Sequence, residues 1–256
     1  MSRCSKLILF LIFTLMVSAQ GVRAIDEQAL CTGSHYIWDS ARFRCMIFET
    51  GHNAVGENFR YEVQYPTRVM DETFIQNAIR TMLENQINIF MGAVNTSTTS
   101  GTPLTEWSLS VNYDVFEFDS SVFSVVFHTE ENTGGAHPNY YVDTITFDRA
   151  HDGILNLQDL FITGSDPLQL IVPFVRNNLE GILGNDPSIV QGIEGGTQPN
   201  YDNFKAFAVT HDALIFFFPP YQVAPFAAGG FTVRMPLSLL NSIWQIGDHA
   251  HPVTKG

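Results

Sequence analysis

The stretch WSLSVNYDVFEFDSSVFSVVFHTEENTGGAHPNYYVDTITF, residues 107–147, decides the fold class. Apolar and polar residues alternate over its first positions, which is the pattern of a half-buried strand. Residues 122–128 and 140–147 are two further runs of β-branched and aromatic side chains. The segment from Asn132 to Gly135 lies between these two runs and is a strong turn signal. The stretch therefore predicts adjacent antiparallel strands.

Two segments outside this stretch have helical spacing. Asp71 is expected to cap a helix whose apolar stripe continues to Phe90. Asp166 is expected to cap a second helix that ends at Gly184, and residues 192–201 are expected to form a loop. Further strands are expected at residues 59–65, 204–209, 213–218 and 231–235. This order predicts an α+β fold, with antiparallel sheets and one helix packed in each half.

Residues 1–24 have the features of a cleavable secretory signal. Arg3 and Lys6 precede an apolar run over residues 7–17, and small residues lead to Ala24. This apolar run is too short for a spanning helix, which needs roughly 20 residues. An uncleaved anchor is the alternative, and no second apolar segment supports it. We therefore expect a secreted or extracytoplasmic protein cut after Ala24, without a membrane attachment once the signal is removed.

The charge of the chain is strongly acidic. It has 13 basic and 26 acidic residues, a net charge of −13. The first 24 residues contain three of the basic residues and none of the acidic ones, so the exported part has a net charge of −16. Such a charge argues against nucleic acid or an anionic membrane as the partner and suits a cationic one. Solubility alone is the simpler explanation.

Two cysteines remain once Cys4 is removed with the signal. In an oxidising compartment Cys31 and Cys45 are expected to form one disulfide that holds the N-terminal arm. Their spacing matches no metal-ligand motif, and we predict no metal and no cofactor. The exported protein is expected to be a monomer. The predicted organisation is a signal (1–24), a disulfide-clipped arm (25–58), an N-terminal half (59–150), a C-terminal half (151–244) and a flexible tail (245–256).

No catalytic residue can be assigned, because the nucleophile-elbow, zinc-protease, P-loop and dinucleotide signatures are all missing. His137 follows Gly134-Gly135, and these glycines would let a ligand approach the backbone closely. Alternatively, the glycines serve only the turn and His137 bonds a backbone carbonyl, which is the interpretation we favour. His249 and His251 could bind a metal if they lay on a strand, but in a tail such a pair is more often incidental.

Residues 216–226 are the most distinctive segment. Three consecutive phenylalanines require either burial on both faces of a strand, or one buried face and one face offered to a partner. The prolines that follow would place Tyr221 and Phe226 on a stiff loop. An exposed pair of aromatic rings would be a binding site, whereas packing in the core is the commoner outcome. Tyr221, Phe226 and His137 are therefore the candidate binding residues.

Several separated segments resemble one family of extracytoplasmic domains. They are residues 133–138 with 146–148, 157–161, 206–218 and 224–229. That family includes the sensor domain of the lysozyme-responsive anti-sigma factor and the accessory domain of a peptidoglycan deacetylase. The chain looks most similar to the mycobacterial secreted immunogenic proteins. The resemblance implies an α+β fold with antiparallel sheets, and it provides no agreed catalytic residues. The anti-sigma relative binds lysozyme, a cationic protein.

These observations lead to three hypotheses. The first is a secreted, non-enzymatic binding domain that acts on a protein or cell-envelope partner, with a cationic protein such as lysozyme as one candidate. The alternative is a cell-envelope hydrolase, a weak esterase, with an unrecognised Ser/His/Asp set in which His137 or His211 is the base. The third is a host-directed antigen or effector, which the sequence does not separate from the first.

Overall fold

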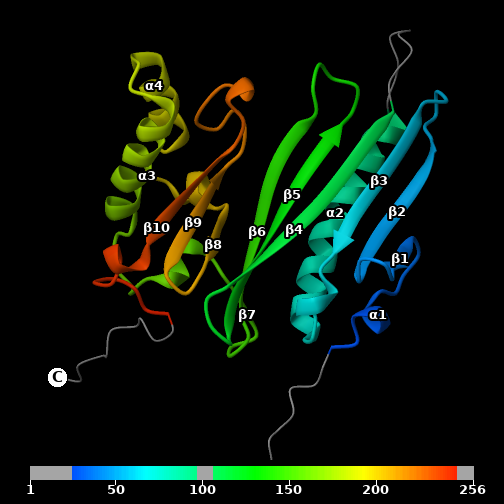
Figure 1. Ribbon diagram of the computed structural model, residues 1–256, viewed down its shortest axis with the longest axis horizontal. Helices are drawn as coiled ribbons and strands as arrows, with labels where there is room; N and C mark the ends of the chain where they lie inside the picture. Colours follow the sequence, from blue (N-terminus) through cyan, green and yellow to red (C-terminus); the bar gives the residue numbers. More distant parts are fainter. Residues whose placement is uncertain (1–24, 97–105, 247–256) are drawn as a thin grey trace, which may run out of the picture.

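The chain folds into two β-sheets and the helices that cover them (Figure 1). The computed structural model describes residues 25–96 and 106–246. The predicted α+β class is confirmed. The predicted signal lies outside the described residues, and so do residues 247–256, which include His249 and His251. In the described ranges no helix has the length and apolar character needed to cross a membrane.

The larger sheet has seven strands in the order in which they occur along the chain. They are β1 (Tyr36–Asp39), β2 (Arg44–His52), β3 (Asn58–Tyr65), β4 (Trp107–Glu117), β5 (Val122–Asn132), β6 (Asn139–Asp148) and β7 (Gly153–Leu155). The three strands predicted within residues 107–147 are thus confirmed and pair antiparallel. The pair β3–β4 is parallel, because the long helix α2 (Thr73–Thr96) connects these two strands.

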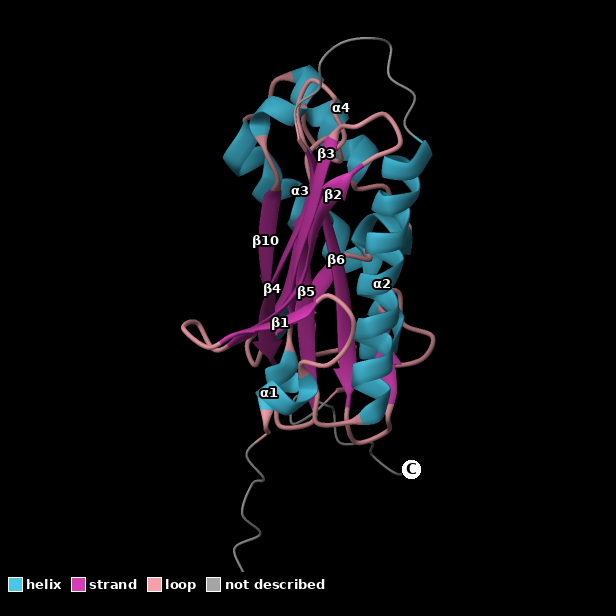
Figure 2. Cartoon of the chain, turned by 90° about the vertical axis from the view of Figure 1, so that its right-hand side faces the viewer, coloured by secondary structure: helices cyan, strands magenta, loops and turns pink. Residues whose placement is uncertain are grey.

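Helix α2 covers one face of the larger sheet (Figure 2). Its apolar stripe recurs at helical spacing, and Ile75, Ile79 and Leu83 on it are fully buried. The strands contribute every second residue to the same core, as Val63 of β3 and Val125 of β5 illustrate. The opposite face of the sheet is therefore free to receive the second half of the chain.

The smaller sheet has the strand order β10-β9-β8. Its strands are β8 (Phe207–Val209), β9 (Ala213–Phe218) and β10 (Phe231–Pro236). Helices α3 (Leu168–Leu183) and α4 (Pro187–Gly196) pack on its outer face. Short helices connect the larger elements: α1 (Glu27–Leu30), η1 (Thr67–Val69), η2 (Leu157–Leu160), η3 (Tyr201–Phe204), η4 (Phe226–Ala228) and η5 (Leu237–Leu239).

Helix α4 corrects two expectations, because residues 192–196 were expected in a loop and each half was expected to contain one helix. Asp186 caps α4 by accepting a hydrogen bond from the Ser188 N–H at 2.9 Å. The glycines of α4 suggested a loop but serve a close contact instead. A Cβ atom at Gly196 would lie 1.9 Å from the carbonyl oxygen of Gln222. Glycine is therefore required where α4 meets the β9–β10 loop.

Strand β9 explains the three consecutive phenylalanines. Phe216 and Phe218 belong to the core shared with α3 and α4. Phe217 points the other way and packs with Val126 of β5 and Ala208 of β8. The strand is thus buried on both faces, which is the first of the two arrangements that the sequence allows.

The edge strand β8 lies on the open face of the larger sheet and is held there by hydroxyl groups. The Val209 N–H donates to Ser124 Oγ at 3.0 Å, and Ser124 Oγ lies 2.8 Å from Thr146 Oγ1. The Phe207 N–H donates to Thr144 Oγ1 at 3.2 Å. Side chains of the larger sheet therefore satisfy backbone groups that an edge strand would otherwise leave unpaired.

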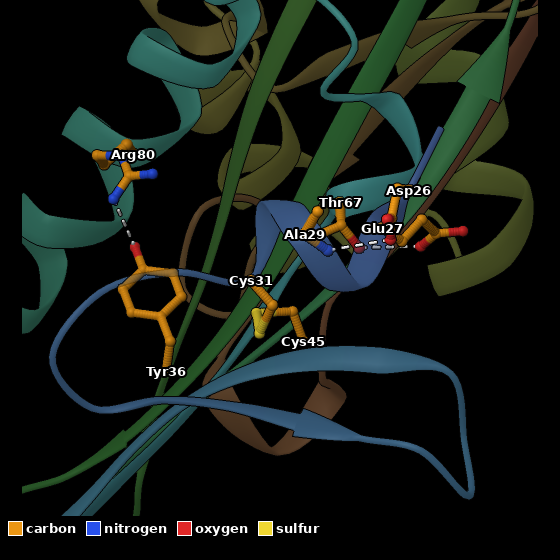
Figure 3. The surroundings of a disulfide bond; sticks show 8 residues. All are labelled: Asp26, Glu27, Ala29, Cys31, Tyr36, Cys45, Thr67 and Arg80. Atoms are coloured by element: carbon orange, nitrogen blue, oxygen red, sulfur yellow. Dashed lines mark hydrogen bonds between the residues drawn. A yellow bond between two sulfur atoms is a disulfide. The ribbon is translucent and has the colours of Figure 1, made fainter. Parts of the chain in front are cut away.

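The predicted arm, residues 25–58, contains strands β1 and β2 of the larger sheet. The predicted disulfide between Cys31 and Cys45 is present, with a Cα–Cα distance of 5.5 Å. It connects the segment after α1 to β2 (Figure 3). Glu27 of α1 also accepts a hydrogen bond from the Thr67 hydroxyl at 2.9 Å. At the other edge, β7 from the predicted C-terminal half pairs with β6.

Replacing Ser124 with alanine would leave the buried Val209 N–H without its acceptor. A buried donor that loses its partner costs about 1–3 kcal/mol, so Ser124→Ala is expected to lower the free energy of unfolding by that amount. Urea denaturation followed by circular dichroism measures this. Ser120→Ala, in the exposed β4–β5 turn, is the control and should stay within about 0.5 kcal/mol of the parent. Equal midpoints for the two variants would contradict the role given to Ser124.

Candidate functional site: a groove between the sheets

A groove of about 610 Å³ lies between the larger sheet and strands β9 and β10. Its position follows from the strand register, because β8 pairs with β9 only from Leu214 to Phe216. Beyond Phe216 no strand of the described residues pairs with β9 on this side. The walls are mainly apolar and include Val142, Phe217 and Phe231. Such a cavity has the size and lining that are typical of ligand sites.

Four side chains, those of His137, Tyr140, Tyr221 and Phe226, pack together beside the groove; we call them the histidine–aromatic cluster. Tyr140 and Phe226 line the groove itself. The rings of His137 and Phe226 are stacked, with centroids 3.6 Å apart and planes inclined by 15°. The centroid of Phe226 also lies 6.0 Å from that of Tyr140 and 5.5 Å from that of Tyr221. The structure therefore brings together all three candidate binding residues, which are far apart in the sequence.

The hydrogen bonds of His137 define the tautomer of its neutral ring. Nδ1 lies 3.0 Å from the carbonyl oxygen of Pro138, which can only accept, so Nδ1 carries the proton. Nε2 then accepts a hydrogen bond from the Tyr221 hydroxyl at 3.0 Å. The expected bond to a backbone carbonyl is present, and the ring also contacts a second loop. Because both ring nitrogens have partners other than serine, His137 is not part of a Ser–His pair.

Two loops of unusual conformation hold this cluster. Gly134 has a φ of 82° in the β5–β6 turn, which glycine adopts readily. Tyr221 has a φ of 73°, which is uncommon for a residue with a side chain. The residue is 65% exposed, so burial does not account for the strained backbone. A strained, exposed aromatic residue at the mouth of a groove points to a binding role.

A second polar pair, of which His128 lines the groove, was not anticipated from the sequence. Nε2 of His128 lies 3.1 Å from Oδ2 of Asp114, and the His128 ring is edge-on to Phe217. The β4–β5 register pairs Asn112 with His128, so Asp114 is a diagonal neighbour on the same face. The available signal in the sequence was that polar residues interrupt the apolar pattern of β4 and β5. This signal does not reveal how the two strands are paired.

The groove beside the cluster contains one carboxylate. Glu130 is exposed and lines the groove, and no lysine or arginine is found among the described lining residues. On the opposite face of the sheet, toward α2, the Tyr141 hydroxyl donates to Glu131 at 3.3 Å. Partial burial, followed by the charge of Glu131, raises the pKa of Tyr141, which keeps this hydroxyl protonated. The groove thus combines a single carboxylate, that of Glu130, with exposed aromatic rings.

The remaining chemistry-bearing residues lie elsewhere. His211 is in the turn between β8 and β9 and is not among the residues that line the groove. Within the described ranges, no three His, Cys, Asp or Glu side chains are grouped so that they could hold a metal ion. The groove and its cluster are therefore the arrangement best suited to binding.

Comparisons with known proteins place this arrangement in context. The family model described as "Protein of unknown function (DUF3298)" matches residues 158–238, and the model "Deacetylase PdaC" matches residues 53–140. The region matched by the first model contains Tyr221 and Phe226 of the cluster, and the region matched by the second contains His137 and Tyr140. The cluster thus forms where the two matched regions meet.

A solved structure shares the fold. A DUF3298 family protein from Pseudomonas aeruginosa superposes with a TM-score of 0.58 at 16% identity, over 79% of this chain and 93% of that one. The protein is thus of the class with a DUF3298-type α+β fold.

Sequence comparison identifies three more specific relatives of this chain. Immunogenic protein MPT64 of Mycobacterium tuberculosis is 28% identical over 186 residues, 72% of this chain and 78% of the relative. Peptidoglycan-N-acetylmuramic acid deacetylase PdaC of Bacillus subtilis is 26% identical over 191 residues, 73% of this chain but 39% of the deacetylase. Esterase Rv3036c of M. tuberculosis is 23% identical over 188 residues, 73% of this chain and 79% of the esterase. The chain is a homologue of the mycobacterial immunogenic proteins and of PdaC, as its motifs predict.

Replacing Phe226 with alanine would remove the ring that contacts all other members of the cluster. Each aromatic pair contributes about 0.5–1.5 kcal/mol beyond burial, so the β5–β6 turn and the β9–β10 loop should both open more easily. We expect faster amide hydrogen exchange at Tyr221 and Gly134 in Phe226→Ala, by roughly tenfold for each 1.4 kcal/mol lost.

The central amides of β5 should keep their exchange rates in this variant. Phe48→Ala, on a partly exposed position of β2, is the matched control and should leave both loops unchanged. Acceleration in the β9–β10 loop alone would show that the cluster does not couple the two segments.

Proposed function

We propose that this protein is an extracytoplasmic, non-enzymatic binding domain that recognises a cationic protein at the mouth of the groove between its sheets. The observation that carries the proposal is the histidine–aromatic cluster, in which an exposed Tyr221 is held in a strained conformation next to a groove that Glu130 lines. Residues 1–24 would direct export and be removed after Ala24. The relationship to the immunogenic proteins supports an extracytoplasmic domain.

The composition of the mouth fits lysine and arginine side chains. Cations are attracted to the faces of aromatic rings, and Tyr140 and Tyr221 offer such rings with 41% and 65% of their surface exposed. Glu130 adds a carboxylate that meets no cation of the groove lining. Tyrosine is also enriched in interfaces, because it contributes a large contact area with little loss of side-chain freedom. The acidic charge of the whole chain would speed the approach of such a partner.

Lysozyme is the cationic protein that we propose as the first probe, because the family that the motifs resemble includes a lysozyme-responsive sensor. A partner in the cell envelope and a host-facing role, which the name of the immunogenic relatives suggests, would use the same surface.

A cell-envelope hydrolase, a weak esterase, is the second candidate. It is favoured by the similarity to a protein named as an esterase and by the His128–Asp114 pair beside an apolar groove. A histidine that hydrogen-bonds to a carboxylate is one part of a hydrolytic triad, but a nucleophile within hydrogen-bond reach must complete it. His137, one of the two bases considered for this role, has its ring nitrogens engaged by Pro138 and Tyr221.

The binding proposal is tested by calorimetry of the exported protein with hen lysozyme at about 50 mM and about 500 mM salt. Binding should weaken at least tenfold at high salt, because screening is nearly complete at that ionic strength. Tyr221→Ala and Glu130→Gln should each weaken binding roughly tenfold, or ~1.4 kcal/mol. Glu194→Gln, which removes an exposed charge on α4, is the charge-matched control and should bind like the parent.

Absence of lysozyme binding would exclude this particular partner. A pull-down with other cationic envelope and host proteins then tests the class, and the lack of any salt-sensitive partner that depends on Tyr221 would overturn the proposal.

The two candidates are separated by assays with p-nitrophenyl acetate and butyrate. If the protein is only a binding domain, p-nitrophenol should appear at the same rate with the protein as in buffer alone. The rate with His128→Ala should then equal the rate with the parent. His151→Ala is the matched control, because His151 pairs with Asp148 at 2.6 Å on an exposed turn away from the groove. Turnover that persists in His151→Ala and disappears in His128→Ala would establish the hydrolase instead.

A further inference from the structure

A second cavity lies on the other face of the larger sheet, between α2 and strands β1 to β3; we call it the α2 cleft. Its volume is about 510 Å³. One wall is the segment from Gly33 to Tyr36, the floor includes Ile47 and Tyr61, and the opposite wall is the side of α2 that includes Arg80 and Glu84. The proposal for the groove makes no use of this cleft.

Arg80 provides one binding group. Its guanidinium carbon lies 5.6 Å from the ring centroid of Tyr36 and 5.7 Å from that of Tyr65. Arg80 Nη1 donates to the Tyr36 hydroxyl at 3.4 Å (Figure 3). No carboxylate of the described residues lies within 4.0 Å of this guanidinium. The two rings therefore orient a planar fork whose remaining N–H groups suit a carboxylate.

Two carboxylates provide the complementary groups. Glu49 on β2 accepts a hydrogen bond from the Tyr61 hydroxyl at 2.6 Å and lies 3.5 Å from Nδ1 of His35. Burial, followed by the hydrogen bond to Glu49 and the charge of Glu49, raises the pKa of Tyr61, so this hydroxyl stays a donor. Glu84 stands one turn after Arg80 on α2 and is exposed. The cleft thus contains acceptors for an ammonium group as well as a donor for a carboxylate.

The charges narrow the class of ligand. A simple anion would meet Glu49 and Glu84, and a simple cation would meet Arg80. A ligand with both charges satisfies each group without repulsion. Ile47, Ile87 and Met91 line the same cleft and would contact an apolar side chain. We propose that the α2 cleft binds a small zwitterion, an α-amino acid or a short peptide, with its carboxylate on Arg80 and its ammonium group toward Glu49 and Glu84.

The disulfide has a place in this site, because it fixes the wall that includes Tyr36. Cys31 lies two residues before Gly33, and its disulfide with Cys45 anchors it to β2. Gly33 has a φ of 146°, and a Cβ atom at this position would lie 2.6 Å from the ring of Tyr36. This close approach sets the ring of Tyr36 against Arg80.

The test titrates the exported protein, with its disulfide intact, with the dipeptide alanyl-leucine and records ¹H–¹⁵N spectra. We expect saturable shifts confined to residues of the α2 cleft, with a Kd of roughly 1 mM or lower. N-acetyl-alanyl-leucine lacks the ammonium group and alanyl-leucinamide lacks the carboxylate, and each should bind at least tenfold more weakly. No saturable shift at roughly 10 mM dipeptide, or undiminished binding of either modified form, would overturn the proposal.

Variants locate the site. Arg80→Gln and Glu84→Gln should each lower the affinity at least tenfold, and Glu84→Gln, at an exposed position, should change the free energy of unfolding by no more than about 0.5 kcal/mol. Arg60→Gln is the control, because Arg60 pairs with Glu106 at 3.6 Å and does not line the cleft. Unchanged affinity in Glu84→Gln, or an equal loss in Arg60→Gln, would overturn the assignment.

Discussion

The seating of the smaller sheet on the larger one is the contact on which the groove and its cluster depend. It combines an apolar cluster, in which Phe217 packs with Val126 and Ala208, with the hydrogen bond from Val209 to Ser124. The apolar cluster supplies most of the free energy, since burial is non-directional and scales with area. The hydroxyl groups fix the position, because an edge strand is satisfied only where its N–H groups meet an acceptor. Because β8 has only three residues, it covers only part of this face of the larger sheet, and the groove lies over the part that β8 leaves uncovered.

Beside this groove, a hydrogen bond between His137 and Tyr221 joins two segments that are 84 residues apart in the sequence. Phe226 lies against three other rings at once, so it is the centre of the arrangement. The left-handed backbone of Tyr221 costs about 1–2 kcal/mol for a residue other than glycine. Its hydroxyl bond to His137 offsets part of this cost while the ring itself stays exposed. A loop selected only for stability would place glycine there, which supports a role for the exposed ring.

Local pattern was enough to predict the strands of residues 107–147, because alternation reports which face of a strand is buried. It was also enough for the disulfide, since two cysteines remain after the signal. It failed for α4, where Gly195 and Gly196 mimic a loop although the close approach of Gln222 requires a small residue. His137, Tyr221 and Phe226 were each recognisable, but their contact depends on how one sheet seats on the other. The His128–Asp114 pair depends in the same way on a register that no short motif encodes.

The acidic charge of the chain is distributed so that the two cavities differ in chemistry. The groove has one carboxylate and several rings without a cation among its described lining residues, whereas the α2 cleft contains the Arg80 guanidinium together with Glu49 and Glu84. They lie on opposite faces of one continuous sheet. Coupling between sites requires an element with two arrangements that both ligands bias. The paired strands between these cavities form an unbroken ladder from β1 to β7, so occupancy of one cavity should leave the affinity of the other unchanged. A small zwitterion would then act as an independent ligand rather than as a regulator of the protein partner.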